Sequence, residues 1–323
     1  MSTAPGQTNV NALLDRGDDL ADSDARAAMS FYQAALQAAR AAPYADPQIV
    51  ARLGAAQEFI RRRAKEFQQS LDTALADFAA EDAAGNIRLR HALEMLKGQR
   101  EIYPQQPSVL YYPYLAQRQF FEREEFGWAE ELEAATPIIR DEIVALVNEG
   151  ADFRPYVQDD PARPKRDFHG LNNNPDWTAL YLWKDGSLVE ENARRCPRTV
   201  EALGKVPMSN IGARTPAVLF SKLEPGAHIP PHHGMLNCRL ICHLPLIVPA
   251  GCWLRVGNET RQWEEGKLLI FDDSIEHEAK NPSGEMRIIL LLDIWRPELS
   301  DAERHGISSV FEAIDTFQTL PDA

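Results

Sequence analysis

The chain carries the run GAHIPPHHG at residues 226–234 and the run DDSIEHE at residues 272–278. Four of its eight histidines lie between residues 228 and 243, and a fifth is His277. Strand-like segments and Gly or Pro turns border both runs, so we expect these histidines at strand ends of a small barrel. Neutral imidazole is a preferred ligand of iron, zinc and copper. The runs therefore predict a site for a divalent transition metal, with a merely polar loop as the alternative reading of His232 and His233.

Short strand candidates surround the two runs. They are rich in apolar residues, have strand length and are separated by turn residues, over 177–183, 217–223, 239–247, 252–256, 267–271 and 286–295. Several short strands with Gly and Pro turns are typical of a sandwich or a jelly roll.

The spacing around His232 departs from the usual iron oxygenase triad. That triad has a His, a carboxylate two residues later and a distant His. Here Gly234 stands where the carboxylate is expected. From spacing alone, the metal would take two protein ligands plus water, or would also bind one nearby acid, Asp272, Asp273 or Glu276.

The first third of the chain has a helical pattern. Apolar residues recur at helical spacing, and the predicted helices span 10–21, 25–41, 47–64, 66–81 and 86–103. Helix pairs of this length resemble tetratricopeptide hairpins, and a generic helical bundle is the alternative. A Pro-rich and aromatic-rich linker is predicted at 104–135, and Glu130–Asn148 is predicted as one amphipathic helix.

Composition narrows the class of protein. A chain of 323 residues with 44% hydrophobic and 25% charged residues is typical of a folded globular protein. Its net charge of −14 argues against a nucleic-acid partner. The sequence shows neither a signal-like leader nor an apolar run of membrane-spanning length. The four cysteines form no CxxC pair and are expected to be buried free thiols, so we predict a cytoplasmic protein with no transmembrane segment.

A set of motifs in order links the chain to a known family. They are Pro231-His232-x-Gly234, Asn237-Cys238-Arg239-Leu240 with His243, Asn258-Glu259-Thr260, Trp263–Lys267, Phe271–Ser274, Glu276–Glu278 and Trp295-x-Pro297-Glu298-Leu299. With these motifs the segment resembles the catalytic domain of aspartyl/asparaginyl beta-hydroxylases, which are dioxygenases dependent on iron(II) and 2-oxoglutarate. Weaker matches extend the resemblance over roughly residues 110 to 300.

The resemblance implies roles for six residues. His232 and His277 correspond to the two iron ligands of the family, which has no carboxylate at the position of Gly234. Arg287 matches the arginine that pairs with the distal carboxylate of 2-oxoglutarate, and a guanidinium suits that task. The remaining matches, Ser221, His243 and Arg239, are expected to bind cosubstrate. Ser221 also fits an ordinary strand serine, and Arg239 also fits a substrate contact or a strand salt bridge.

The animal hydroxylases carry a second arginine two positions after the one that matches Arg239. It helps recognise the acidic substrate side chain, and Ile241 stands there in this chain. The resemblance thus implies an enzyme that uses Fe(II), 2-oxoglutarate and O2 to hydroxylate an unactivated carbon of an Asp- or Asn-type side chain, releasing succinate and CO2. The alternatives are a hydroxylase of a small metabolite or lipid, and a non-catalytic binding protein.

The expected fold is α+β. A helical, tetratricopeptide-like region at 1–105 precedes a double-stranded β-helix (jelly-roll) domain at 106–305 and a C-terminal tail at 306–323. The substrate is expected to be a protein, a peptide or a small molecule, and the helical region is expected to bind a protein partner.

Overall fold

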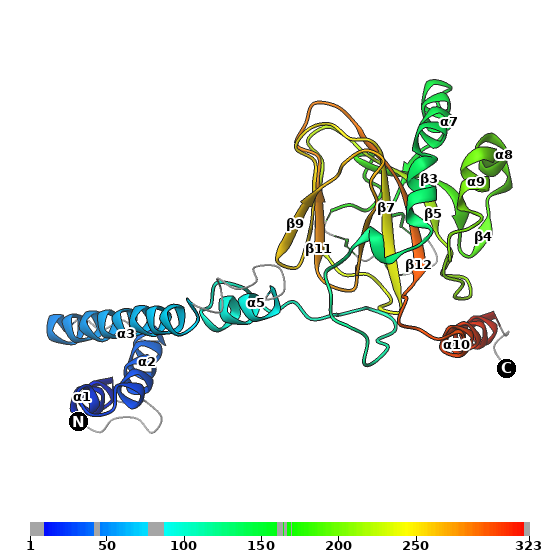
Figure 1. Ribbon diagram of the computed structural model, residues 1–323. Helices are drawn as coiled ribbons and strands as arrows, with labels where there is room; N and C mark the ends of the chain where they lie inside the picture. The colour runs from blue at the N-terminus through cyan, green and yellow to red at the C-terminus, as the bar shows by residue number, and fades with distance from the viewer. Residues whose placement is uncertain are drawn as a thin grey trace. The chain divides into compact units, whose positions relative to one another are not determined.

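The computed structural model describes residues 10–41, 46–76, 87–159, 164, 167–168 and 170–319. The chain divides into two compact units, Met1–Arg100 and Glu101–Ala323. The described part of the first unit is helical, and the second carries the β-strands (Figure 1).

The helical unit contains α1 (Val10–Leu20), α2 (Ala25–Ala41), α3 (Pro47–Ala74) and α5 (Ile87–Leu96). Leu14 of α1 is buried against Tyr32 of α2 and their apolar neighbours. The two helices approach closely at Gly17, where an added Cβ would lie 2.4 Å from Cε1 of Tyr32. Asp46 caps the start of helix α3, and its side chain accepts a hydrogen bond from the backbone N–H of Gln48.

The predicted break between 47–64 and 66–81 is wrong, because α3 runs unbroken to Ala74. No Gly or Pro lies between residues 55 and 75, so nothing in this stretch ends the helix. Residues 77–86, which include the end of the predicted 66–81 helix, lie outside the described residues. The tetratricopeptide-like character of this unit stays a prediction.

The second unit begins with a mixed segment. It contains β1 (Phe120–Phe121), the 3-10 helix η1 (Arg123–Glu125), α6 (Ala129–Ala134), α7 (Thr136–Asn148), β2 (Arg154–Pro155), β3 (Trp177–Lys184), β4 (Ser187–Leu188), α8 (Glu190–Arg195) and α9 (Pro197–Leu203). Eight strands and a helix follow: β5 (Val218–Leu223), β6 (His228–His232), β7 (Arg239–Ile247), β8 (Trp253–Val256), β9 (Glu259–Gln262), β10 (Leu269–Phe271), β11 (His277–Lys280), β12 (Arg287–Trp295) and α10 (Asp301–Thr319).

Two sheets form the core of this unit. The larger has the order β1-β10-β7-β12-β5-β3-β2, with β4 paired to β3, and the smaller has the order β6-β11-β8-β9. Along the chain, β5, β7, β10 and β12 belong to the larger sheet, and β6, β8, β9 and β11 belong to the smaller one. This exchange between two facing antiparallel sheets is a jelly roll, so the predicted class of helices plus a jelly roll is confirmed.

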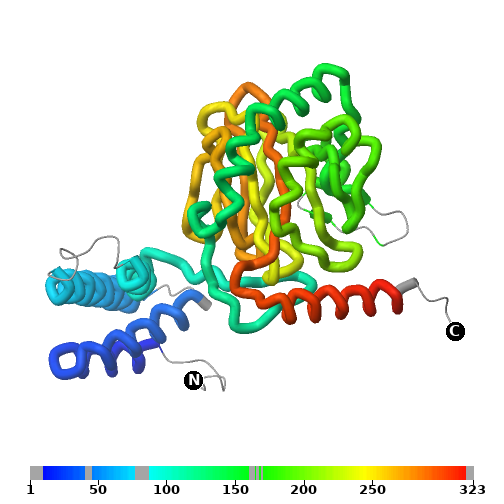
Figure 2. Tube along the Cα trace, turned by 45° about the vertical axis from the view of Figure 1, so that its right-hand side comes forward, coloured from blue at the N-terminus to red at the C-terminus, as the bar shows by residue number. Residues whose placement is uncertain are grey.

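Strand β7 is buried on both faces. Leu240, Cys242 and Leu244 point to the cluster that includes residues of α6 and α7, which cover the larger sheet (Figure 2). The alternate residues Arg239, Ile241 and His243 line a cavity on the other face. Since side chains alternate along a strand, one strand holds the apolar core and presents polar groups to the cavity.

Three strands of the smaller sheet were not predicted. Strand β6 lies at the edge of this sheet and contains Pro230 and Pro231. Proline lacks the N–H that a central strand needs, so its strand positions are mostly at edges, and the sequence there resembles a loop. The edge strand β9 and the short strand β11 are rich in polar residues, so their sequences also resemble loops.

The predicted helix over Glu130–Asn148 is two helices, α6 and α7, which meet at Ala135. Pro137 lies in the first turn of α7, where its missing N–H costs nothing. Of the predicted stripe, Ile139 is buried but Ile138 is 42% exposed. The tail expected at 306–323 is helical as far as Thr319, and Phe311 is buried there. All four cysteines are free and buried, as predicted.

Candidate active site

A cavity of about 440 Å³ is lined by residues of both jelly-roll sheets. It brings together all six residues that the sequence singled out: Ser221, His232, Arg239, His243, His277 and Arg287. They come from β5, β6, β7, β11 and β12, so they converge only through the pairing of the two sheets. Much of the remaining lining is aliphatic and aromatic.

His232 and His277 form a pair at one side of the cavity. They are register partners across β6 and β11, and their ring centroids are 4.1 Å apart. The Nδ1 of His232 lies 2.8 Å from the carbonyl oxygen of Pro230, and the Nδ1 of His277 lies 3.1 Å from that of Ile275. A carbonyl oxygen only accepts, so each Nδ1 donates, and in a neutral ring Nε2 is then the nitrogen whose lone pair can bind a metal ion. The two imidazoles are thereby oriented as metal ligands would be.

Burial keeps the imidazole of His277 neutral. Desolvation is the main cause that holds its pKa well below the usual value, and the neighbouring His232 lowers this pKa further. A histidine must be unprotonated to bind a metal ion, so this environment favours the ligand form.

Gly234 leaves room for a neighbouring carboxylate. A Cβ on Gly234 would lie 2.0 Å from Oδ2 of Asp273, whose backbone carbonyl accepts from the N–H of Gly234 at 2.7 Å. No side chain fits at position 234 while Asp273 keeps this place. Among the described residues, no group of three or more His, Cys, Asp or Glu side chains is arranged to hold a metal ion.

Of the three acids that the spacing left open, only Asp273 lines the cavity. Asp272 is fully buried in an ion pair with Arg296, whose Nη1 donates to Oδ2 of Asp272 at 2.8 Å. Glu276 pairs with Arg255 at 2.9 Å. Asp272 and Glu276 are therefore engaged elsewhere.

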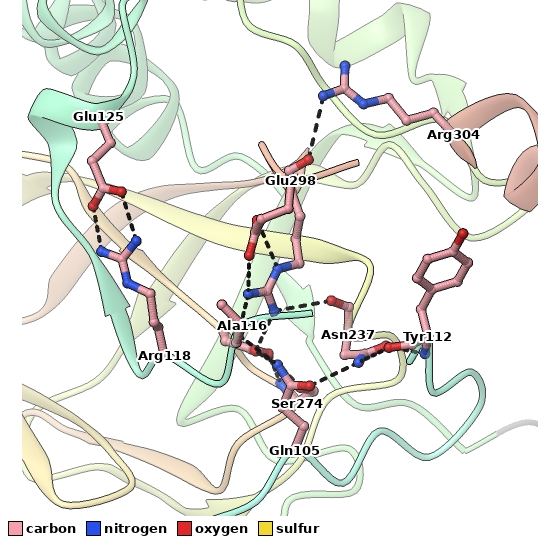
Figure 3. Close-up of polar contacts among 11 residues, drawn as sticks. Gln105, Tyr112, Ala116, Arg118, Glu125, Asn237, Ser274, Glu298 and Arg304 are labelled. Carbon is pink, nitrogen blue, oxygen red and sulfur yellow. Dashed lines mark hydrogen bonds and ion pairs between the residues drawn. The ribbon is translucent and has the colours of Figure 1, made fainter. Parts of the chain in front are cut away.

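A buried network holds the segment before His277. The side-chain amide of Gln105 donates to Oδ2 of Asp272 at 2.6 Å and accepts from Asn237 at 3.0 Å (Figure 3). Both the backbone N–H and the hydroxyl of Ser274 donate to Oδ1 of Asp272. These bonds fix residues 272–274 between β10 and β11, and thereby the positions of Asp273 and His277. Gln105 was not singled out from the sequence, where nothing marks it as a buried partner.

Arg287 is a buried cation that lines the same cavity. Its side chain is 1% exposed, it forms no ion pair with any described residue, and its Nε has no hydrogen-bond partner. Burial lowers the pKa of Arg287 to about 10, and its guanidinium lies 5.0 Å from the ring centroid of Trp263. A buried charge without a partner is costly, so this position is suited to an anionic ligand.

Two further donors accompany Arg287. The indole N–H of Trp263 donates to Nδ1 of His243 at 3.2 Å. Burial, with a smaller effect of Arg287, lowers the pKa of His243 well below its usual value, so the neutral ring carries its proton on Nε2. The indole N–H of Trp177 donates to the hydroxyl oxygen of Ser221 at 3.1 Å, which leaves the Ser221 hydroxyl proton free to donate.

We call Ser221, His243 and Arg287 the donor cluster. Trp263 stood in a sequence motif and Trp177 at the start of a predicted strand, but their role as hydrogen-bond donors was not predicted. A buried indole N–H needs a hydrogen-bond acceptor, so each tryptophan was itself a sign in the sequence of a polar partner nearby.

Arg239 has carboxylate neighbours on two sides. Its Nη2 donates to Oδ2 of Asp273 at 3.0 Å, and its Nε lies 3.6 Å from Oδ2 of Asp293. Although burial opposes it, these carboxylates raise the pKa of Arg239 above its ordinary value. A strand salt bridge was one of the roles that the sequence allowed for Arg239. The structure contains this salt bridge, and it lies in the wall of the cavity.

Comparison with protein-family models identifies one family. The model of the family described as "Aspartyl/Asparaginyl beta-hydroxylase" matches residues 133–297, just over half of the chain. Human "Aspartyl/asparaginyl beta-hydroxylase" is 36% identical over 190 residues, which cover 58% of this chain and 24% of that protein. "Ornithine lipid ester-linked acyl 2-hydroxylase" of Rhizobium tropici is 37% identical over 180 residues, 55% of this chain and 60% of that protein.

The match thus spans about a quarter of the length of the human relative. Among solved structures, the Cnp3 cupin domain of Schizosaccharomyces pombe covers 42% of this chain and 74% of that domain, with 12% identity and a TM-score of 0.27. With the family model matched over the region that contains the histidine pair and the donor cluster, the chain belongs to the aspartyl/asparaginyl beta-hydroxylase family.

Proposed function

We propose that the chain is an Fe(II)- and 2-oxoglutarate-dependent dioxygenase that hydroxylates an unactivated carbon of an Asp- or Asn-type side chain in a protein or peptide. The observation that carries this proposal is the unpaired, buried Arg287 in the same cavity as the pair His232 and His277. A cavity with two imidazole side chains and a separate anion site suits a metal together with an anionic cosubstrate that chelates it.

The residues present fit both groups. The Nε2 atoms of His232 and His277 would hold iron. The donor cluster would bind the distal carboxylate of 2-oxoglutarate, because a guanidinium, an imidazole N–H and a hydroxyl all donate. Bound iron would supply the redox chemistry by which 2-oxoglutarate, O2 and a substrate C–H become succinate, CO2 and C–OH.

The protein's own contribution is positioning and exclusion of water. Trp177 and Trp263 orient the hydroxyl of Ser221 and the imidazole of His243 through their indole N–H groups. Leu254 and Leu291 provide apolar wall around these donors, so a carboxylate bound there would be shielded from bulk water. Two histidines without a charged ligand hold iron weakly, which makes cosubstrate chelation a large part of metal retention.

The test is an anaerobic titration of the protein with Fe(II) and 2-oxoglutarate, followed by the visible charge-transfer absorption of the chelate. We expect the absorption band in the parent protein, its loss in His232→Ala and its weakening in Arg287→Ala. A parent protein that shows no band and binds Zn(II) or nothing would support the rival, a jelly-roll binding protein without turnover.

A second candidate is a hydroxylase of a lipid or small metabolite. The observations that favour it are the mostly apolar lining of the cavity and the similarity to the Rhizobium tropici acyl hydroxylase. Once the cofactor complex is established, succinate release with peptides, free amino acids and acyl lipids separates the candidates.

The remaining expectations concern setting and partners. No helix in the described parts of the chain is long and apolar enough to cross a membrane. The cytoplasmic location and a protein partner for the helical unit remain predictions.

A further inference from the structure

Two loops adjoin the histidine pair. Residues 233–238 follow His232, the last residue of β6, and we call them the first loop. Residues 272–276 lead into His277, the first residue of β11, and we call them the second loop. Each histidine thus lies at a strand end that continues directly into one of the loops, so the placement of the loops contributes to where the imidazoles lie.

One segment of the chain contacts both loops. It is Glu101–Gln119, at the start of the second unit, and we call it the supporting segment. Three of its backbone N–H groups donate to carbonyl oxygens of the loops: Ser108 to Gly234 at 3.1 Å, Val109 to Met235 at 3.0 Å and Gln106 to Ser274 at 2.7 Å. The family match begins at residue 133 and does not include this segment.

The side chain of Gln105 joins the two loops from within the supporting segment. It is 7% exposed. Its NH2 group donates to Oδ2 of Asp272 in the second loop at 2.6 Å, and also to the carbonyl oxygen of Ala116 at 3.3 Å. Its oxygen accepts from the NH2 group of Asn237 in the first loop at 3.0 Å (Figure 3). The amide thus uses both of its protons and its oxygen.

Asn237 fixes the first loop to the same segment. It is fully buried, its NH2 group also donates to the carbonyl oxygen of Tyr112 at 2.9 Å, and its oxygen accepts from the backbone N–H of Tyr112 at 2.6 Å. A carboxamide both donates and accepts, whereas a carboxylate only accepts and an apolar side chain does neither. A buried network with every bond made favours a single arrangement of its members.

The second loop also carries the group that orients His277. The Nδ1 of His277 donates to the carbonyl oxygen of Ile275, and the backbone N–H of Ile275 donates to the carbonyl oxygen of Asp272 at 3.3 Å. A shift of Asp272 would therefore move the acceptor that holds the imidazole. Contacts of this kind, one step removed from a metal ligand, set how well the ligand is placed.

We infer that Gln105 is a positioning residue of the metal site. Through Asp272 it fixes the second loop and thereby the ring of His277, and through Asn237 it ties that loop to the one that follows His232. The inference rests on the proposed function and adds to it a residue outside the family match.

The test measures the affinity for Mn(II) with 2-oxoglutarate present, by titration followed through the electron paramagnetic resonance signal of the free ion. Gln105→Met removes the donors and the acceptor at nearly constant length, and we expect the Kd for Mn(II) to rise about 10- to 100-fold. The matched control is Gln106→Met. Gln106 is the exposed neighbour, and its contact with the second loop is a backbone N–H that the variant keeps. This control should bind Mn(II) as the parent does.

A second control separates positioning from stability. Leu203 of α9 is 1% exposed and packs in the core between the larger sheet and its helices, and it does not line the cavity. Leu203→Ala should lower the melting temperature and leave the Kd for Mn(II) unchanged. If Gln105→Met does not fold, Gln105→Ala replaces it, because water can enter the space and satisfy Asp272 and Asn237 without tying the loops to the supporting segment. Its Kd should also rise.

The outcomes distinguish the two levels. A parent protein that binds no Mn(II) in the presence of 2-oxoglutarate fails the proposed function, and the inference falls with it. A parent that binds, together with an unchanged Kd in a folded Gln105 variant, overturns the inference alone. An equal loss of affinity in Leu203→Ala or in Gln106→Met overturns it as well, because the effect would then not be specific to the link between the loops.

Discussion

His232 and His277 face each other across two neighbouring strands, with ring centroids 4.1 Å apart, although 45 residues separate them in the chain. Their Nδ1 atoms both point to backbone carbonyl oxygens two residues earlier, those of Pro230 and Ile275. The two rings are therefore oriented by the same kind of hydrogen bond, so Nε2 is the atom of each ring that would bind a metal under the proposed function.

Removing either ring should abolish iron binding. We expect His232→Ala and His277→Ala to weaken Fe(II) binding more than about 100-fold, because each deletes half of the protein ligands. The matched control is His228→Ala, also on β6, whose imidazole is exposed and pairs with Glu278 at 2.7 Å. Equilibrium dialysis with 2-oxoglutarate present measures the effect, and equal binding by the His277 variant and the His228 control would refute the assignment.

Replacement of Arg287 should stabilise the folded protein and abolish the binding of 2-oxoglutarate. An apolar Met of similar length removes a buried, unpaired charge, so without ligand Arg287→Met should raise the free energy of unfolding by about 1 to 4 kcal/mol. The same variant should lose the increase in melting temperature that 2-oxoglutarate confers with Mn(II) present. Thermal denaturation with and without ligand checks both effects, and a destabilised variant that still responds to ligand would contradict the prediction.

A side chain at position 234 should disturb the site. The Cβ of Gly234→Ala would lie 2.0 Å from Oδ2 of Asp273, so the carboxylate must move. We expect a loss of about 1 to 3 kcal/mol in stability together with weakened hydroxylation. Gly284→Ala, where an added Cβ meets nothing within 4 Å, is the control and should behave as the parent in urea denaturation. A Gly234→Ala variant as stable as the parent would show that Asp273 can move aside without cost, which would contradict the prediction.

Asp293 should make stability depend on pH. Burial raises its pKa from 3.8 to about 6, so between these values the folded protein binds more protons than the unfolded chain. Its contribution to stability is complete below pH 3.8 and is lost as the pH rises through 6.

Asn cannot titrate, so the advantage of Asp293→Asn over the parent should grow by about 2 kcal/mol from pH 4 to pH 7. Denaturant unfolding at several pH values gives this difference. A difference that does not change with pH would mean that Asp293 is ionised throughout the range.

The buried pair of Asp272 and Arg296 should be strongly coupled. Both side chains are 0% exposed, so Arg296→Met or Asp272→Asn alone leaves a buried polar group without its partner and should cost about 3 to 5 kcal/mol. The double variant should recover much of this loss. Chemical denaturation of the four proteins gives the coupling free energy, and simple additivity of the two losses would refute it.

The candidate site could be predicted from the sequence to a large extent, because its chemistry depends on residue types in a recognisable order. His232, His277 and Arg287 are marked by their kind and by the motifs around them, and all three line one cavity. Strands such as β7 and β12 are nearly continuous apolar runs, and their burial on both faces makes them visible in the sequence.

The tertiary structure decided what depends on residues distant in the chain. Strand β6 is a strand because β11 pairs with it, which the Pro230-Pro231 sequence conceals. The choice among Asp272, Asp273 and Glu276 was open in the sequence because three nearby carboxyl groups are chemically alike. It was decided by partners far along the chain: Arg296 and Gln105 engage Asp272, Arg255 engages Glu276, and Arg239 holds Asp273 in the cavity wall. The sequence states the chemical type of each side chain directly. The ion pairs and hydrogen bonds of the cavity form only when strands that are distant in the chain pair with one another.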